Sequence, residues 1–143
     1  MAEEMTPEAR RAFLTSATRT AILATTRADG RPHAVPVCFV LEGDDVLFVT
    51  NETTAKARAL QRDPRVTLVV DDETPPFAFV MIEGTAEVSR SPDDIEPVAS
   101  KIGERYDGPD GVEEFVRFAK EILGLLVRVR PTRIVALDRV GEQ

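Results

Sequence analysis

The sequence predicts a mainly β protein of the α+β class, in which about six antiparallel strands form a barrel with helices at its periphery. Two observations support this prediction. Strand-like apolar runs follow one another with only short turns between them, and helical segments do not alternate regularly with strands. Short connections favour hairpins, whereas a regular β–α alternation would favour a doubly wound parallel sheet. The 143 residues contain neither an internal repeat nor a linker, so we expect one domain over residues 1–143.

The chain begins with a predicted helix over residues 7–16. Thr6 can cap this helix, Pro7 suits its first position, and Glu8 adds an acid to the first turn. The run TAILATT, residues 20–26, is a continuous stretch of the kind expected for a buried strand.

A hairpin is predicted immediately after this strand. Asp29-Gly30 between apolar, β-branched runs is a strong turn signal, and residues 32–42 form the returning arm. The returning arm is apolar on both pleat faces, which predicts a strand that is covered on both sides. The turn GDD then leads into a third strand at 46–50.

The returning arm contains two prolines, Pro32 and Pro36. Proline cannot donate a hydrogen bond to a sheet, so this stretch suits an edge strand or a bulge. One interpretation is that the prolines keep the strand from full pairing where it offers a flat apolar surface and free carbonyl groups to a planar ligand. The alternative is an edge strand protected against aggregation, and the local sequence does not distinguish the two.

After the third strand, the sequence pattern changes from that of a strand to that of a helix, and strands follow again. Residues 53–64 are good helix formers, with Thr53 or Thr54 as the cap and Pro64 as the end. The remaining elements are predicted strands at 65–72 and 77–90, helices at 91–106 and 111–123, and one or two strands within 125–140.

Composition excludes several classes of protein. The net charge of −7 argues against a general binder of nucleic acid or anionic membranes, because such proteins are basic. No apolar run reaches the roughly 18 residues that span a bilayer, and the charged N-terminal segment does not resemble a signal peptide. A single cysteine cannot form an internal disulfide, so a cytoplasmic location is expected.

The side chains available for catalysis are few. His33 and Cys38 are the only histidine and cysteine, and their odd spacing places them on opposite sides of one predicted strand. This arrangement argues against a Cys–His pair and against a two-ligand metal site. We therefore assign no catalytic residue and no metal ligand, and expect a cofactor to supply the chemistry if the protein is an enzyme.

The second predicted helix is the basic part of an acidic chain. Residues 53–65 contain four cations and one acid. Lys56 falls in the first turn, where the helix dipole disfavours a cation but where free backbone N–H groups and a lysine together can bind a phosphate. Arg58 and Arg62 lie one turn apart and repel each other unless an anion lies between them. The alternative is an exposed helix with solvated arginines.

Three stretches resemble one known family at matching spacings. They read AILATTRADGRPHAVPVCFV, LFVTNETTAKARALQRDPRVTLVVDD and VMIEGTAEV. Over about residues 10–90 the chain resembles the pyridoxamine 5′-phosphate oxidase-like split-barrel superfamily, and within it the F420-dependent flavin/deazaflavin oxidoreductases of group B. The resemblance implies a six-stranded antiparallel split β-barrel that forms a homodimer, with two cofactor sites at the subunit interface.

The resemblance also implies which residues bind the cofactor. One group, on the strand with the two prolines, would lie beneath the isoalloxazine or deazaflavin ring. A second group, at the end of the third strand, matches positions near the ribityl chain and phosphate. A third, on the basic helix, matches residues that bind the phosphate and, more weakly, an acidic tail. In this order the groups are His33, Pro36 and Val37; Thr50 and Asn51; and Thr54, Lys56, Arg58 and Arg62.

We therefore expect an F420-dependent oxidoreductase that transfers hydride from the reduced deazaflavin to a small conjugated organic acceptor. The basic helix in an acidic chain favours F420, because its tail adds carboxylates that Arg58 and Arg62 can bind. Two alternatives remain open. One is an FMN-dependent oxidase or reductase on the same fold, and the other is a non-catalytic carrier of F420, FMN or haem, with His33 as a candidate axial ligand.

Overall fold

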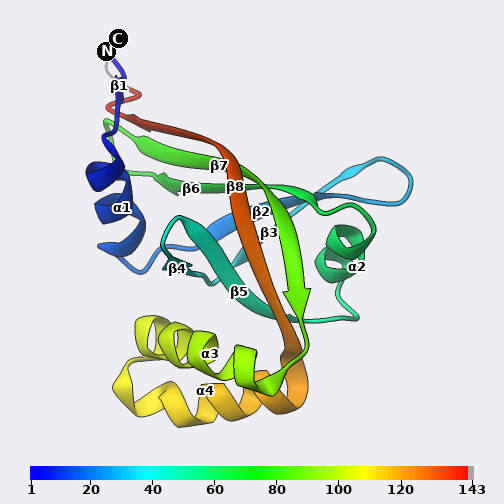
Figure 1. The fold of residues 1–143 in the computed structure, drawn as a ribbon. Helices are drawn as coiled ribbons and strands as arrows, with labels where there is room; N and C mark the ends of the chain where they lie inside the picture. The colour runs from blue at the N-terminus through cyan, green and yellow to red at the C-terminus, as the bar shows by residue number, and fades with distance from the viewer. Residues whose placement is uncertain (142–143) are drawn as a thin grey trace.

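A computed structural model describes residues 1–141 and shows a mainly antiparallel β structure with helices around it (Figure 1). One eight-stranded sheet has the order β3-β2-β6-β7-β8-β5-β4, and β1 pairs with β8 outside this path. The strands are β1 (Glu3–Glu4), β2 (Ala21–Thr26), β3 (Pro32–Val37), β4 (Val40–Glu42), β5 (Asp45–Asn51), β6 (Arg65–Asp72), β7 (Ala78–Ser89) and β8 (Gly124–Asp138). The helices are α1 (Pro7–Thr15), α2 (Ala55–Arg62), α3 (Pro92–Asp107) and α4 (Val112–Phe118), with a 3-10 turn at Pro109–Gly111 and a π-helical turn at Ala119–Leu123.

This architecture confirms the predicted fold class. The helix caps expected from the sequence are also present: Thr6 Oγ1 accepts a hydrogen bond from the Ala9 N–H at 3.1 Å, and Thr54 Oγ1 accepts one from the Ala57 N–H at 3.3 Å. The sheet has eight strands rather than about six, because β1 was not predicted and the segment 32–42 forms two strands.

Asp29-Gly30 belongs to the turn between β2 and β3, as predicted. Gly30 has a φ of 88°, in the left-handed region that favours glycine, and its N–H donates to Arg27 O at 2.9 Å. From this turn β3 pairs with β2 over its whole length.

The two prolines lie where they remove no hydrogen bond from the sheet. The Arg27 N–H donates to Arg31 O at 2.8 Å, and counting from this bonded pair puts Pro32 and Pro36 at positions whose backbone groups point away from β2. They point toward the free edge, because β3 is the end of the strand order. β3 is thus fully paired on one side and, with two prolines, poorly able to accept another strand on the other.

The segment 32–42 is not one strand, contrary to the prediction. Two residues, Cys38 and Phe39, separate β3 from β4, and α3 supplies hydrogen-bond partners for the backbone of Phe39. The Phe39 N–H donates to Tyr106 Oη at 3.1 Å, and Arg105 Nη1 donates to Phe39 O at 2.9 Å. Cys38 therefore lies outside the strand, and the expected alternation between it and His33 does not apply.

The segment 111–123 is not one regular helix either. It contains the end of the 3-10 turn, then α4, then the π-helical turn. Gly124 follows with a φ of 78°, a left-handed conformation that ends the helical segment and lets the chain enter β8. The segment 125–140 forms one long strand over most of its length, with an irregularity in its pairing to β7 beside Gly84, where an added Cβ would lie 2.6 Å from Arg130 O.

Two hydrophobic clusters hold the fold together. The larger one fills the barrel with alternate side chains of the sheet, plus Leu14 of α1 and Leu60 of α2. The smaller one packs α3 and α4 against the outer face of β4, β5 and β8, where Leu47 and Leu126 are buried. Both faces of β5 are therefore covered, which accounts for its uninterrupted apolar sequence.

The outer face of β3, β2, β6 and β7 is not covered in this way. One register row across this open face, continued on β8, consists of apolar residues that belong to neither cluster, and Ile22 in it is 39% exposed. The expectation that β3 is covered on both sides is therefore not met within this chain. The row comprises Pro36, Ile22, Val69, Met81 and Val135. Within residues 1–141 no helix combines the length and apolar composition needed to cross a membrane.

Candidate cofactor site

The candidate site lies where β5 leads into α2. Thr54 is the N-cap of this helix, and Lys56 lies in its first turn. The cap satisfies the Ala57 N–H, whereas the N–H groups of Ala55 and Lys56 have no hydrogen-bond partner among residues 1–141. Free N–H groups at a helix N-terminus form an environment that favours an anion.

Lys56 is the unusual cation of this turn. It is partly buried, and in the described part of the chain its ammonium group has neither a hydrogen bond nor an ion pair. Burial lowers the pKa of Lys56 below the ordinary lysine value, because surroundings of low polarity disfavour the charged form. A partly buried cation without an internal carboxylate suits a site that receives its anion from outside the chain.

Thr50 and Asn51, at the end of β5, contact the residues that begin α2. Asn51 Oδ1 accepts hydrogen bonds from the Thr53 N–H at 2.9 Å and from Thr53 Oγ1 at 2.6 Å, and its Nδ2 donates to Ile122 O at 2.7 Å. Thr50 is buried, with Oγ1 3.4 Å from Thr54 Oγ1. Both side chains contact protein groups that shape the start of α2.

The predicted ring-binding residues lie on β3, which packs beside α2. Val37 is buried in the barrel. His33, four residues earlier and therefore on the same face of β3, is partly buried, whereas Pro36 belongs to the open face. The three residues therefore do not share one pleat face.

Thr25 is a residue of this region that the sequence reasoning missed. It is 4% exposed and is the cross-strand partner of His33, and both Thr25 Oγ1 and His33 Nδ1 are buried without a hydrogen-bond partner among the described residues. The signal was present in the sequence, because both positions lie four residues from Asp29 in the predicted hairpin turn.

The arginines of the basic segment have three different environments. Arg58 is exposed and has no partner in the described chain; two residues after Lys56, it projects from about the opposite side of α2. Arg62 Nη2 donates to Thr26 O at 2.8 Å and so ties α2 to β2. Arg65 forms an ion pair with Asp63 at 2.8 Å. The structure thus does not bring all four cations together.

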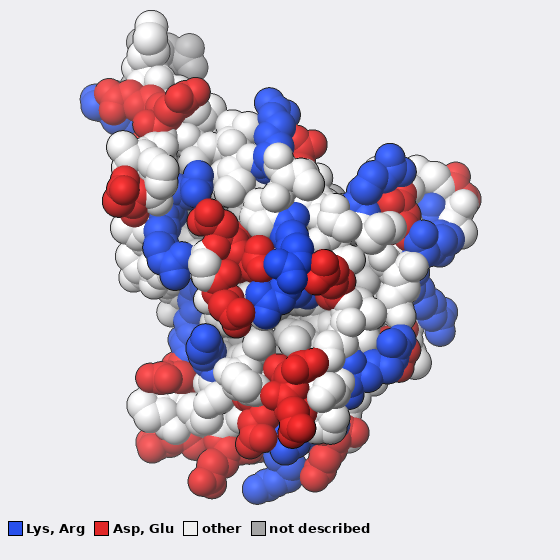
Figure 2. Space-filling model, in the orientation of Figure 1, with Lys and Arg blue, Asp and Glu red and all other residues white. Residues whose placement is uncertain are grey.

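Charge is nevertheless unevenly distributed over the molecule. Figure 2 shows Lys and Arg side chains along the edge where α2 and the β2–β3 hairpin lie, and Asp and Glu side chains over α3 and α4. Residues 1–141 contain no cluster of three or more side chains suited to a metal ion. The chemistry that this arrangement supports is the binding of an anion at the start of α2 and of a flat group along β3.

Comparison with solved structures gives the same fold. The chain is 29% identical to a conserved hypothetical protein of Mycobacterium tuberculosis, with a TM-score of 0.83, covering 96% of this chain and 87% of that one. It is 24% identical to an F420 reductase (TM-score 0.69; 90% and 98% covered). It is 22% identical to HutZ, the heme storage protein of Vibrio cholerae (TM-score 0.74; 94% and 96% covered).

The family comparison covers most of the sequence. The model of the pyridoxamine 5′-phosphate oxidase family matches residues 6–130, a range that includes every strand from β2 to β7 and all four helices. The chain therefore belongs to the pyridoxamine 5′-phosphate oxidase family.

Proposed function

We propose that this protein is a cytoplasmic F420-dependent oxidoreductase that transfers hydride from the reduced deazaflavin to a small conjugated organic acceptor. The observation that carries the proposal is Lys56, a partly buried cation without an internal partner beside two free N–H groups. These groups fit the phosphate of such a cofactor. When bound, the reduced deazaflavin would supply the hydride, and the acceptor would gain that hydride and one proton.

The residues of this chain would bind and orient rather than react. Lys56 and the start of α2 would hold the phosphate, and the free edge of β3 would lie along the ring system. His33 is a titratable side chain on β3 itself. We assign it a polar contact with the cofactor and no proton transfer. We assign no side chain as a general acid, so the proton would come from solvent or from the cofactor.

The choice of F420 over FMN rests on charge. Arg58 and Arg62 lie one turn apart on α2, and among the described residues neither forms an ion pair, although the charge of Arg62 contributes to the lowered pKa of the neighbouring Asp63. The acidic tail of F420 would supply carboxylates for such pairs, whereas FMN ends at its phosphate. An F420 reductase among the structural neighbours supports the same choice.

We further propose that the protein acts as a homodimer that pairs through the open sheet face. The row containing Ile22, Val69 and Met81 is apolar, and within residues 1–141 it belongs to neither hydrophobic cluster. Burial of such a face against a second copy is favourable through the hydrophobic effect. The cofactor sites would then lie at the margin of the interface.

A non-catalytic carrier is the second candidate, since one structural neighbour is a heme storage protein. His33 would be its axial ligand, yet His33 is only partly accessible and its Nδ1 is buried. FMN remains the alternative cofactor for an enzyme on this fold.

The deciding experiment measures the affinity of the purified protein for F420, FMN and haem side by side. It then measures turnover with reduced F420 and a panel of enone and quinone acceptors. We expect F420 to bind most tightly and at least one acceptor to be reduced. Tight FMN binding without F420 binding would overturn the cofactor assignment, and tight F420 binding without any turnover would favour the carrier.

The variant Lys56→Ala tests the phosphate site directly. Loss of a hydrogen bond to a charged group should weaken F420 binding by about 1.5–3 kcal/mol, roughly tenfold to 150-fold. Lys101→Ala, at an exposed position on α3, is the matched control. An unchanged dissociation constant in Lys56→Ala would remove this residue from the site.

A further inference from the structure

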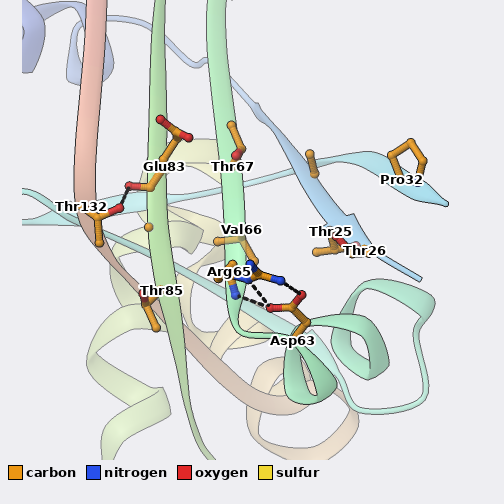
Figure 3. A pocket seen from close by; sticks show the side chains of 12 residues that line it. Thr25, Thr26, Pro32, Asp63, Arg65, Val66, Thr67, Glu83, Thr85 and Thr132 are labelled. Atoms are coloured by element: carbon orange, nitrogen blue, oxygen red, sulfur yellow. Dashed lines mark hydrogen bonds and ion pairs between the residues drawn. The ribbon is translucent and has the colours of Figure 1, made fainter. Parts of the chain in front are cut away.

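A pocket of about 660 Å³ lies at the point where β2 and β6 separate (Figure 3). The two strands pair at only three positions, of which Ala24–Thr67 is the last, although both strands continue beyond it. The space between the diverging ends is lined by residues of five strands and by the end of α2. A pocket of this volume accommodates a small organic molecule.

Threonine side chains dominate the pocket wall. Thr26 of β2, Thr67 of β6 and Thr85 of β7 have hydroxyl groups without a hydrogen-bond partner within residues 1–141. Thr132 lies at the irregularity in the β7–β8 pairing, where its Oγ1 donates to Glu83 O at 3.1 Å. Each hydroxyl can donate one hydrogen bond and accept two. Three such groups from three strands therefore form a surface for a ligand with several hydrogen-bonding groups.

The charged residues of the pocket wall are paired within the protein. Asp63 accepts two hydrogen bonds from the Arg65 guanidinium, at 3.0 and 2.8 Å, and these bonds lower the pKa of Asp63 to about 2. Glu83 Oε1 accepts a hydrogen bond from Arg133 Nη1 at 3.1 Å. A charged ligand would find no uncompensated partner here and would lose hydration on entry, whereas an uncharged ligand loses less.

The pocket is separate from the candidate phosphate site. Lys56 lies in the first turn of α2, and Asp63 follows the last residue of the helix. Eight residues of α-helix span about 12 Å. The pocket lining contains none of the residues predicted to bind the cofactor, although it shares Thr25 with the region beside His33. Ala24, Thr67 and Glu83 form the register row next to Ile22, Val69 and Met81 on the open face, so in the proposed dimer the pocket adjoins the interface.

We propose that this pocket is a second binding site, distinct from the proposed phosphate site at the start of α2, which takes an uncharged small molecule bearing several hydroxyl groups. The hydroxyls of Thr26, Thr67 and Thr85 hydrogen-bond the ligand. Ala24 and Val66, which also line the pocket, contact its carbon atoms.

The test uses ribitol, D-ribose and myo-inositol as uncharged probes, with gluconate and glucosamine as charged counterparts. Saturation-transfer NMR on the full-length protein detects binding, and titration gives the dissociation constants. We expect at least one uncharged probe to bind more tightly than both charged ones. Thr67→Val and Thr85→Val should each weaken it by about threefold to tenfold, the effect of one lost hydrogen bond.

Two further variants separate this proposal from the proposed function. Ala24→Leu should abolish probe binding by filling the pocket, whereas Lys56→Ala and the exposed Thr18→Val should leave it unchanged. Thr67→Val should in turn leave F420 and FMN binding unchanged. The proposal is overturned if no uncharged probe binds, if a charged analogue binds more tightly, or if affinity is the same in Thr67→Val and Ala24→Leu as in the original protein.

Discussion

Lys56 combines a property that favours a ligand with one that opposes folding. Its charge is partly removed from water, and no carboxylate of the described chain compensates for the lost hydration. Other cations that are largely shielded from water have partners, as Arg128 does with Asp45 at 2.9 Å. A partly buried cation without such a partner and without a local benefit is expected at a functional site.

We predict that Lys56→Met raises the free energy of unfolding at neutral pH and removes part of its pH dependence. The pKa of Lys56 is lowered in the folded state, so between that pKa and the ordinary lysine value the unfolded state binds more protons. Stability therefore rises with pH through this window, and the unfavourable contribution is fully present below it. Methionine keeps the length of the side chain without the charge.

Urea denaturation of both proteins at pH 7 and at alkaline pH measures this effect. The variant should have the higher midpoint at pH 7, and the difference should shrink as the pH rises. Lys101→Met, at an exposed position, should show no comparable gain. A lower midpoint for Lys56→Met at pH 7 would contradict the prediction.

Among the secondary-structure elements, the turn between β5 and α2 depends on one side chain. Asn51 Oδ1 accepts two hydrogen bonds from Thr53, and Asn51 Nδ2 donates one to Ile122 O in the π-helical turn. These bonds join the start of α2 to the chain just before β8, more than 70 residues later. The position of Lys56 therefore depends on a contact that local sequence does not reveal.

We predict that Asn51→Ala lowers the free energy of unfolding by about 1–3 kcal/mol, because three hydrogen bonds are lost. Binding of the phosphate-containing cofactor should weaken as well, since the first turn of α2 is less well held. Chemical denaturation and a binding titration measure the two effects. Glu52→Ala is the control: its ion pair with Arg90 is half exposed, so its removal should cost less than about 1 kcal/mol. Equal effects of the two variants would show that Asn51 has no special role.

At the scale of the whole molecule, the open sheet face carries an apolar row, yet no described part of the chain covers it. Five apolar side chains lie in one register row, outside both hydrophobic clusters. By contrast, the exposed Phe118 and Ile122 on the helical side are not part of a sheet-wide row. This contrast offers a matched pair of substitutions.

We predict that Val69→Lys converts a dimer of about twice 15.7 kDa into a monomer, with a dissociation constant at least about 100-fold higher. The substitution would place an unpaired charge at the centre of the proposed interface. Sedimentation equilibrium measures the mass. Phe118→Lys, which adds the same charge at a side chain that is 45% exposed, should leave the dimer intact. If both variants keep the mass of the original protein, the open face is not the interface.

The sequence predicted most elements because their signals are local. Thr6 and Thr54 cap the helices that they were expected to cap, and Gly30 adopts the left-handed conformation that its turn requires. The predictions for 32–42 and 111–123 were wrong for a common reason. In the first of these segments the course of the backbone depends on Arg105 and Tyr106, which lie more than 60 residues away. In the second, Ile122 O accepts from Asn51, again a distant residue.

The candidate site shows the same division. Spacing and composition alone determined that Lys56 lies in the first turn of a capped helix, and they restricted Pro32 and Pro36 to an edge strand or a bulge; the strand order shows that it is an edge. Only the tertiary structure decided that Lys56 is partly buried without a partner and that Arg65 is paired with Asp63. It alone showed the threonine-lined pocket between β2 and β6. Capping and turn preferences act over three or four residues, whereas burial and ion pairing depend on which distant strands the fold brings together.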